Sequence, residues 1–284
     1  MAVYKRTYTG YSGEMTPAWS RFQILPRANY SRLGQSKLLM ILRMAAWFWP
    51  AGSIAFVYLA NNLSVLTDLG IPAGNFLTVD ANFFLTFCWV QGIFAYLITA
   101  LVGPGLVSPD LVNNALPLYF ARPFSRTEYV LGKMSILAIP LSTITWVPGL
   151  VVFTVQASLA GWDWTTDNIG IAAALFVGLA LWVLLLCLLA LAISAFVKWR
   201  IAAGALLLGI FVAGAGFGSA INQIVRTDYG SLINLPLVMY TIWMQLFAKE
   251  TDTGLSVQSA WAAVALVLAD VCGCCGARSG RLRS

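Results

Sequence analysis

Long uncharged apolar segments, separated by short polar ones, recur along the whole chain. A helix needs about 20 consecutive apolar residues to cross roughly 30 Å of hydrocarbon. Backbone groups inside lipid must hydrogen-bond within the protein, and these runs are continuous rather than alternating with the period of two that a barrel strand needs. The pattern therefore predicts an all-α polytopic membrane protein. Its six transmembrane helices are expected at about residues 38–60, 82–102, 135–159, 169–197, 201–220 and 256–277.

Two of these spans carry residues with special backbone roles. Pro140 and Pro148 lie in the third span, where each removes a hydrogen-bond donor, so we expect kinks at both. Gly214 and Gly218 lie one helical turn apart in the fifth span, a spacing that lets a neighbouring helix approach closely. Ordinary helix packing explains these glycines more simply than a seam between two copies of the chain.

The N-terminal segment, residues 1–37, is polar, aromatic and basic. Thr16 followed by Pro17 is typical of a helix start, and the large apolar side chains that follow share one broad arc of a helical wheel. We expect an amphipathic helix on the inner leaflet, bent at Pro26, and no cleaved signal peptide. The residues predicted to hold this helix at the interface are Trp19, Arg21, Phe22 and Arg27.

Residues 231–248 are also uncharged and apolar, and could form a seventh span. A seventh crossing would place the C-terminal arginines outside, whereas six crossings leave nearly all Lys and Arg side chains on the cytoplasmic side. Asn234, Pro236 and Gln245 suit a re-entrant hairpin on the outer face better, provided that it is buried against protein. The predicted layout is a cytoplasmic segment at 1–37, a transmembrane domain at 38–277 and a cytoplasmic tail at 278–284.

Composition supports a lipid environment. The chain is 60% hydrophobic and 10% charged, with a mean hydropathy of +0.80, whereas soluble domains carry about 25% charged residues. Because Lys and Arg collect in cytoplasmic loops, the net charge of +6 indicates orientation, and no nucleic-acid partner is expected. We expect a multi-pass protein of the bacterial inner membrane, with membrane lipid as a partner and both termini in the cytoplasm.

Several kinds of chemistry are excluded or disfavoured. The chain has no histidine, which excludes His-based acid–base catalysis and His-containing zinc motifs. Five cysteines imply no disulfide framework. Small residues at a helix end explain Cys272, Cys274 and Cys275 more simply than lipidation or a metal site. No metal or cofactor is expected to bind to this chain.

The segment between spans two and three is the most informative part of the sequence. The residues from Ser108 to Asp110 are typical of a helix start, and a short helix is expected at about 108–120, ending before Arg122. Ser125 followed by Glu128 predicts a capping box that starts the helix leading into span three. A short helix held at both ends is one that a partner protein can push.

After Asp110 the segment contains, in order, Tyr119, Arg122-Pro123, Ser125-Arg126, Glu128-Tyr129 and Gly132-Lys133. In these residues it resembles the corresponding loop in permeases of ABC exporters of the type-2 class. In that family a short helix with an acidic start is followed by a Tyr, a Ser-or-Ala-Arg-Pro, a Ser-Arg, an acidic–aromatic pair and a Gly-Lys at the entry to span three. The N-terminal interfacial helix, six spans, Gly-rich fifth span and outer hairpin are similar too, so the resemblance covers nearly the whole chain. The matching loop residues are Asp110, Tyr119, Ala121, Arg122, Pro123, Ser125, Arg126, Glu128, Tyr129, Gly132 and Lys133.

The resemblance implies that the helix near Asp110 is a coupling helix, which docks in a cleft of a separate ABC-type ATP-binding subunit. The interfacial helix would pack against the same subunit. ATP and Mg would then bind to that partner, and this chain would assemble with a second permease copy or a homologous permease. The implied coupling residues are Asp110, Leu111, Asn113, Asn114, Leu118, Tyr119, Arg122, Arg126 and Glu128.

Two features depart from the pattern of that family. No charged residue lies between Asp110 and Arg122, so docking would depend on apolar and amide contacts, and the cysteine-containing C-terminus is unlike the usual basic tail. Arg122, Arg126 and Lys133 also satisfy a simple charge rule for cytoplasmic loops, although that rule does not account for the Pro, Ser and Glu around them.

Two other functions stay open at the level of sequence. A membrane-embedded enzyme would need convergent polar residues at membrane depth, and the charged candidates are Arg43 and Asp270, both near span ends. An ATP-independent channel or carrier would be favoured by inverted repeats or several intramembrane charges, and neither is seen. Any ATP hydrolysis belongs to another chain, since Thr127 and Met134 stand where a Walker loop around Lys133 needs Gly and Ser or Thr.

Overall fold

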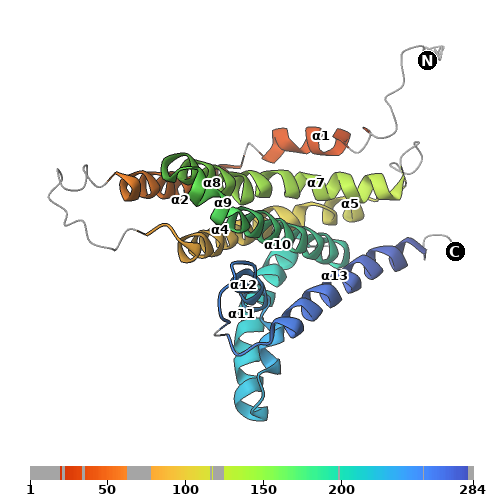
Figure 1. Cartoon of the computed structure of the whole chain (residues 1–284). Coiled ribbons are helices and arrows are strands. Elements are labelled where there is room, and N and C mark those ends of the chain that lie inside the picture. Colours follow the sequence, from red (N-terminus) through yellow and green to blue (C-terminus); the bar gives the residue numbers. More distant parts are fainter. Residues whose placement is uncertain are drawn as a thin grey trace, which may run out of the picture.

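The computed structural model describes residues 20, 23–33, 36–62, 78–115, 117, 125–197, 199–251 and 253–280. Helices account for most of these residues, and no strand occurs among them (Figure 1). In chain order the elements are α1 (Ile24–Leu33), α2 (Lys37–Asn61), α4 (Ala81–Val102), η2 (Gly103–Gly105), α5 (Ser108–Val112), α7 (Arg126–Ile144), α8 (Trp146–Ala160), α9 (Trp162–Asp167), α10 (Ile169–Phe196), α11 (Arg200–Val225), η3 (Tyr229–Ile233), α12 (Leu235–Leu246) and α13 (Val257–Gly280).

Five helices of the described chain are long and apolar enough to cross a membrane. They comprise α2, α4 with its extension through α5, α7 together with α8, α10, and α11. α13 is 24 residues long, and its part Val257–Asp270 is apolar over a shorter length. The all-helical class is thus confirmed for the described residues, while the sixth crossing stays a prediction.

The predicted limits of three spans agree with the helix ends to within one residue, namely those of α2, α4 and α10. Polar caps explain where two of these helices start. The Ser36 hydroxyl accepts from the Leu39 N–H at 3.5 Å, and the Asp80 carboxylate accepts from the Phe83 N–H at 3.1 Å. α11 instead continues to Val225, beyond its predicted end at residue 220.

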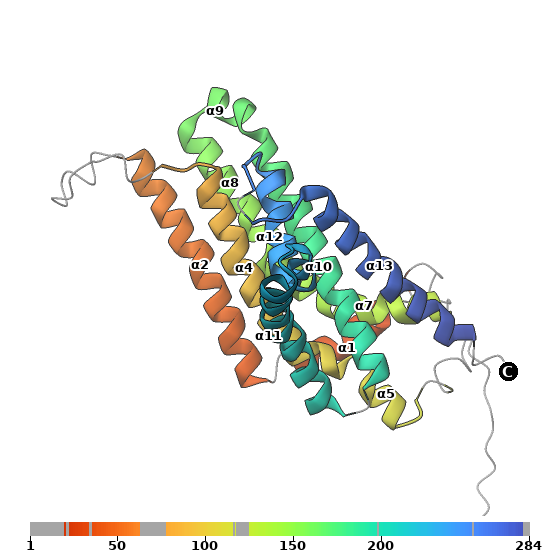
Figure 2. The same cartoon turned by 90° about the horizontal axis from the view of Figure 1, so that it is seen from below.

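α10 is the central helix of the bundle, in contact with α4, α7, α8, α11, α12 and α13 (Figure 2). Its residues are apolar on all sides, as expected for a helix surrounded by protein and lipid. α2 lies at the outside, and large apolar side chains on its outer face, including Met44 and Phe48, are exposed. Such a face is suited to contact lipid tails.

The third predicted span consists of two helices, α7 and α8, which meet at Thr145. Pro148 has no N–H for the Ile144 carbonyl, which removes one bond of the regular helical pattern just before it. Both the N–H and the hydroxyl of Thr145 donate to the Leu141 carbonyl, at 3.0 and 2.8 Å. Of the two expected kinks, the one at Pro148 therefore occurs as a break at Thr145, while α7 continues through Pro140.

α11 departs from the direction of the other long helices. It runs down the page in Figure 1 and is seen almost end-on in Figure 2. η3 then packs along α11, and α12 follows. The hairpin predicted at 231–248 thus corresponds to most of η3 and all of α12. With 12 residues, α12 is about 18 Å long, too short to cross a bilayer.

Trp243 fixes α12 to the bundle. Its side chain is 2% exposed and lies between Gly92 of α4 and Gly178 of α10. The indole N–H of Trp243 donates to the Gly178 carbonyl, and that of Trp182 donates to the Gly92 carbonyl, both at 3.1 Å. A Cβ added at Gly92 or Gly178 would come within 2.9 Å of the Trp243 ring, so glycine is needed at both positions. The short helix is thereby buried against protein.

Candidate functional site

The connection between α4 and α7 contains most of the coupling residues predicted from the sequence, and Arg126 and Glu128 lie at the start of α7. Among the described residues of the connection, α5 covers Ser108–Val112 and Pro117 is again helical, so the helix expected at 108–120 is interrupted between them. Asn113 and Asn114 form a turn instead, and Asn114 has a φ of 49°. Asn tolerates this left-handed conformation better than most residues because its short polar side chain can hydrogen-bond locally.

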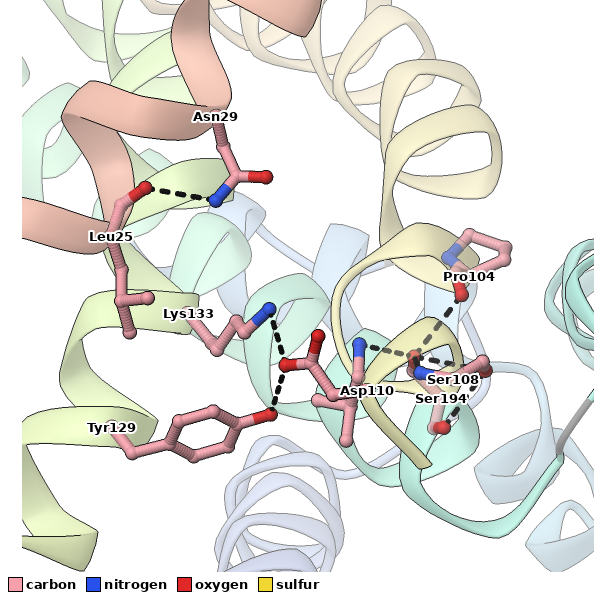
Figure 3. Close-up of polar contacts among 9 residues, drawn as sticks. Leu25, Asn29, Pro104, Ser108, Asp110, Tyr129, Lys133 and Ser194 are labelled. Carbon is pink, nitrogen blue, oxygen red and sulfur yellow. Dashed lines mark hydrogen bonds and ion pairs between the residues drawn. The ribbon is translucent and has the colours of Figure 1, made fainter. Parts of the chain in front are cut away.

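An ion pair joins the two sides of this connection (Figure 3). The Lys133 ammonium of α7 lies 2.7 Å from Oδ2 of Asp110 in α5, and the Tyr129 hydroxyl donates to the same oxygen at 2.7 Å. The ammonium also lies 5.6 Å from the centre of the Tyr129 ring, within the range of a cation–π contact. Asp110, Tyr129 and Lys133, here called the Asp110 cluster, therefore hold α5 against α7.

Burial makes the Asp110 cluster a strong constraint. The Lys133 side chain is 5% exposed and the Asp110 side chain 14%, so each charge is largely removed from water and needs the other. Tyr129 and Lys133 lie one turn apart on α7, which directs both to the same partner. The carboxylate already binds a cation and a hydroxyl, so the cluster is suited to positioning rather than to catalysis.

The predicted coupling residues have different surroundings. Asp110 is turned inward to its cluster, Leu111 is half-buried, and Asn113 and Asn114 are exposed. The tip of the predicted site, with Leu118, Tyr119 and Arg122, lies outside the described residues.

The capping box predicted at the start of α7 is confirmed. The Glu128 N–H donates to the Ser125 hydroxyl at 3.2 Å, and the Glu128 carboxylate accepts from the Ser125 N–H at 2.6 Å. Arg126 is the first residue of α7. Glu128, predicted as a coupling residue, thus has a structural role at the point where the connection enters α7.

The described part of the N-terminal segment packs on α7 beside this site. α1 begins at Ile24, so Pro26 lies in its first turn, where a missing N–H costs little. Leu25 is buried, and Figure 3 shows its side chain extending toward the Asp110 cluster. Arg27 is exposed, as an interfacial or docking residue would be. Trp19, Arg21 and Phe22 lie outside the described residues.

Tyr30 ties α1 to α7 by a hydrogen bond from its hydroxyl to the Ser135 carbonyl at 3.0 Å. Burial raises the pKa of Tyr30 from 10.0 to about 12, and Arg43 opposes part of that rise. The phenol is therefore protonated at neutral pH and can donate this bond.

Gly214 and Gly218 pack within this chain. A Cβ added at Gly214 would lie 2.7 Å from the Ile233 carbonyl oxygen, and one added at Gly218 would lie 2.6 Å from the Gly230 carbonyl oxygen. The close neighbour of α11 is thus the backbone of η3 rather than another long helix. This agrees with ordinary packing, the interpretation favoured from the sequence.

Sequence reasoning did not find Ser194, which bonds to the start of α5 from α10 (Figure 3). It is the only hydroxyl side chain in α10, and its side chain is fully buried. A single polar residue within a long apolar run was the available signal. Its partners could not be inferred, because they lie more than 80 positions away in the chain.

Comparisons with known protein families and with curated proteins find no match to this chain. The class of protein therefore follows from the architecture: a helical protein with five helices long and apolar enough for a multi-pass membrane protein. Within it, a connection fixed at both ends forms the candidate site.

Proposed function

We propose that this chain is the membrane-spanning permease subunit of an ATP-driven ABC transporter, an exporter, and that it couples to a separate ATP-binding subunit. The observation that carries the proposal is the connection between α4 and α7. Asp110 and Lys133 hold its two sides together, while Asn113 and Asn114 are exposed. A surface element mounted firmly on two spans can transmit the movement of a partner.

The arrangement of α1 supports a single docking surface. α1 packs on α7, and α5 is joined to α7 by the ion pair of Asp110 and Lys133. Arg27 on α1 and Asn113, which follows α5, are both exposed. Closure of two ATP-binding subunits around ATP would push this surface, separate the two permease copies and move substrate outward. ATP and Mg bind to the partner in this proposal.

The direction of the helices supports an even number of crossings. Figure 2 shows α5, the start of α2 and the end of α13 at one end of the bundle, with α9 at the opposite end. Between the end of α10 and the start of α13, the chain passes from the end of the bundle with α5 to the end with α9. This path corresponds to one crossing of the membrane. Six crossings of a bacterial inner membrane, with both termini in the cytoplasm, are consistent with this path.

Co-purification tests the proposal directly. The tagged chain, extracted from its native membrane in mild detergent, is expected to recover a soluble ATPase with a Walker loop. Tyr119→Ala or Arg122→Ala should weaken retention of that ATPase about tenfold, the effect of losing one central contact. Thr166→Ala on α9, at the opposite end of the bundle, is the control and should leave retention unchanged.

A channel, a carrier or a membrane-embedded enzyme would be purified without an ATPase. Recovery of the intact chain alone would therefore reject the permease assignment. Recovery of an ATPase whose retention is insensitive to both loop substitutions would keep the class of protein but reject the docking site.

A further inference from the structure

The first turn of α5 has no side-chain cap of its own. Val107 precedes the helix and is apolar, so it offers no acceptor for the N–H groups that every helix start leaves without an intrahelical partner. Pro109 has no N–H, and the N–H groups of Asp110 and Leu111 both donate to the Val107 carbonyl, at 3.0 and 3.2 Å. The N–H groups of Val107 and Ser108 are left, and both are buried.

The hydroxyl of a serine in another helix accepts hydrogen bonds from both of these N–H groups. The Ser194 hydroxyl of α10 lies 2.9 Å from the N–H nitrogen of Val107 and 2.9 Å from that of Ser108, and it donates to the Pro104 carbonyl at 3.2 Å (Figure 3). In a continuous helix the Ser108 N–H would donate to Pro104 itself. The Ser194 hydroxyl stands between these two groups, so it both interrupts the helix and caps its next segment.

The contact is reciprocal. α10 ends at Phe196, so the Ser194 carbonyl lies in its last turn and Val197 stands at its C-cap. The Ser108 hydroxyl donates to the Val197 carbonyl at 2.7 Å and lies 2.9 Å from the Ser194 carbonyl oxygen. Each serine side chain thus hydrogen-bonds to backbone groups at the helix end in which the other serine lies. Both serines are at most 1% exposed.

We infer that Ser108 and Ser194, the serine pair, are positioning residues that fix α5 to the end of α10, so that α10 moves with α5. This inference rests on the proposed function, because it names the helix that receives the movement of the coupling segment. α10 is suited to that role, since it contacts α4, α7, α8, α11, α12 and α13. Gly178 of α10 also holds Trp243, so movement of α10 reaches α12 by direct packing.

The anchoring is tested first without any partner. Val107→Cys is introduced into the full chain, with the C-terminal Cys272, Cys274 and Cys275 replaced by Ser, and its reaction with a maleimide is timed in detergent. Val107 is 8% exposed, so labelling should be slow. Adding Ser194→Ala leaves two buried N–H groups without an acceptor and should speed labelling about tenfold.

Two internal controls separate a local release from unfolding. Ser135→Ala removes a hydroxyl that bonds only to Leu131 of its own helix in the described structure, and should leave the labelling rate unchanged. Cys88 is fully buried in α4 and should stay protected in every variant. If Ser194→Ala speeds labelling at both Val107→Cys and Cys88, or at neither, the inference is overturned.

The second arm uses the complex with the co-purified ATPase. Ser194→Ala should lower kcat for ATP hydrolysis about tenfold at unchanged KM for ATP and unchanged retention of the ATPase, because the movement is no longer transmitted. Equal kcat in wild type and variant overturns the role of the serine pair in coupling. If wild type recovers no ATPase, the proposed function fails, and the labelling arm still decides whether Ser194 anchors α5.

Discussion

At the scale of single residues, the structure depends on a few polar groups placed in apolar surroundings. Asp110, Lys133 and Tyr129 satisfy one another in the Asp110 cluster, and the serine pair satisfies two helix ends. Each group is costly to bury alone and inexpensive to bury with its partner. Removing one partner should therefore cost far more than removing both.

The Asp110 cluster gives the sharpest case. Lys133→Met leaves the Asp110 carboxylate buried without its cation, which should lower the free energy of unfolding by about 3–5 kcal/mol. The double substitution Asp110→Asn with Lys133→Met should recover most of that loss. Denaturant unfolding in mixed micelles measures both. Asp167→Asn, at an exposed site on α9, is the control, and additive effects of the two cluster substitutions would contradict the ion pair.

Tyr30 predicts a dependence on alkaline pH. Its folded-state pKa of about 12 lies above the usual value of 10.0, so the protein favours the neutral phenol. The contribution of the Tyr30 contact should be fully present below pH 10.0 and be lost as pH rises toward about 12. The difference between ultraviolet titrations of wild type and Tyr30→Phe should show one tyrosine ionising near the top of that range. A difference curve centred at pH 10.0 would contradict the buried contact.

At the scale of elements, one helix repairs the defect of another. Pro50 lies inside α2 and cannot donate to the Ala46 carbonyl one turn before it. The Gln91 side-chain amide of α4 donates to that carbonyl at 3.0 Å, and both Gln91 and Ala46 are fully buried. The proline is thus tolerated because α4 supplies the missing donor, and the same bond joins the two helices.

A double-mutant cycle tests this repair. Gln91→Met in wild type should lower the free energy of unfolding by about 0.6 kcal/mol, the average for hydrogen bonds between membrane helices, and by no more than about 1.7 kcal/mol. In the Pro50→Ala background the new N–H serves Ala46, so Gln91→Met should cost much less. Thr99→Ser, in the same helix as Gln91, keeps a hydroxyl that bonds to Ala95 and is the control. An equal cost of Gln91→Met in both backgrounds would reject the repair.

At the scale of the whole molecule, the path of the chain predicts which residues share a side of the membrane. α5 and α9 lie at opposite ends of the bundle in Figure 2, and Asn113 beside α5 and Thr166 in α9 are both exposed. A membrane-impermeant maleimide should therefore label Thr166→Cys on intact spheroplasts and Asn113→Cys only on inverted vesicles. Labelling of both from the same side would reject the six-crossing path and the docking site with it.

Most of the helices could be predicted because their cause is local. The limits of α2, α4 and α10 follow from where an apolar run meets polar residues, and Ser36 and Asp80 cap the starts of the first two helices. The capping box of Ser125 and Glu128 could be predicted for the same reason, since both partners lie within one turn. The end of α5 at Val112 was not predicted. The turn at Asn113 and Asn114 needs a left-handed backbone conformation at Asn114, which asparagine permits but does not require.

The sequence by itself determined that this is a helical membrane protein, because the length and polarity of an apolar segment decide whether it can cross the hydrocarbon core of a membrane as a helix. Only the tertiary structure decided which polar groups meet. Ser108 and Ser194 lie 86 positions apart, and Gln91 and Ala46 lie 45 apart. Such partners are chosen by the packing of helices in space, since a buried polar group bonds to whatever donor or acceptor the neighbouring helix presents.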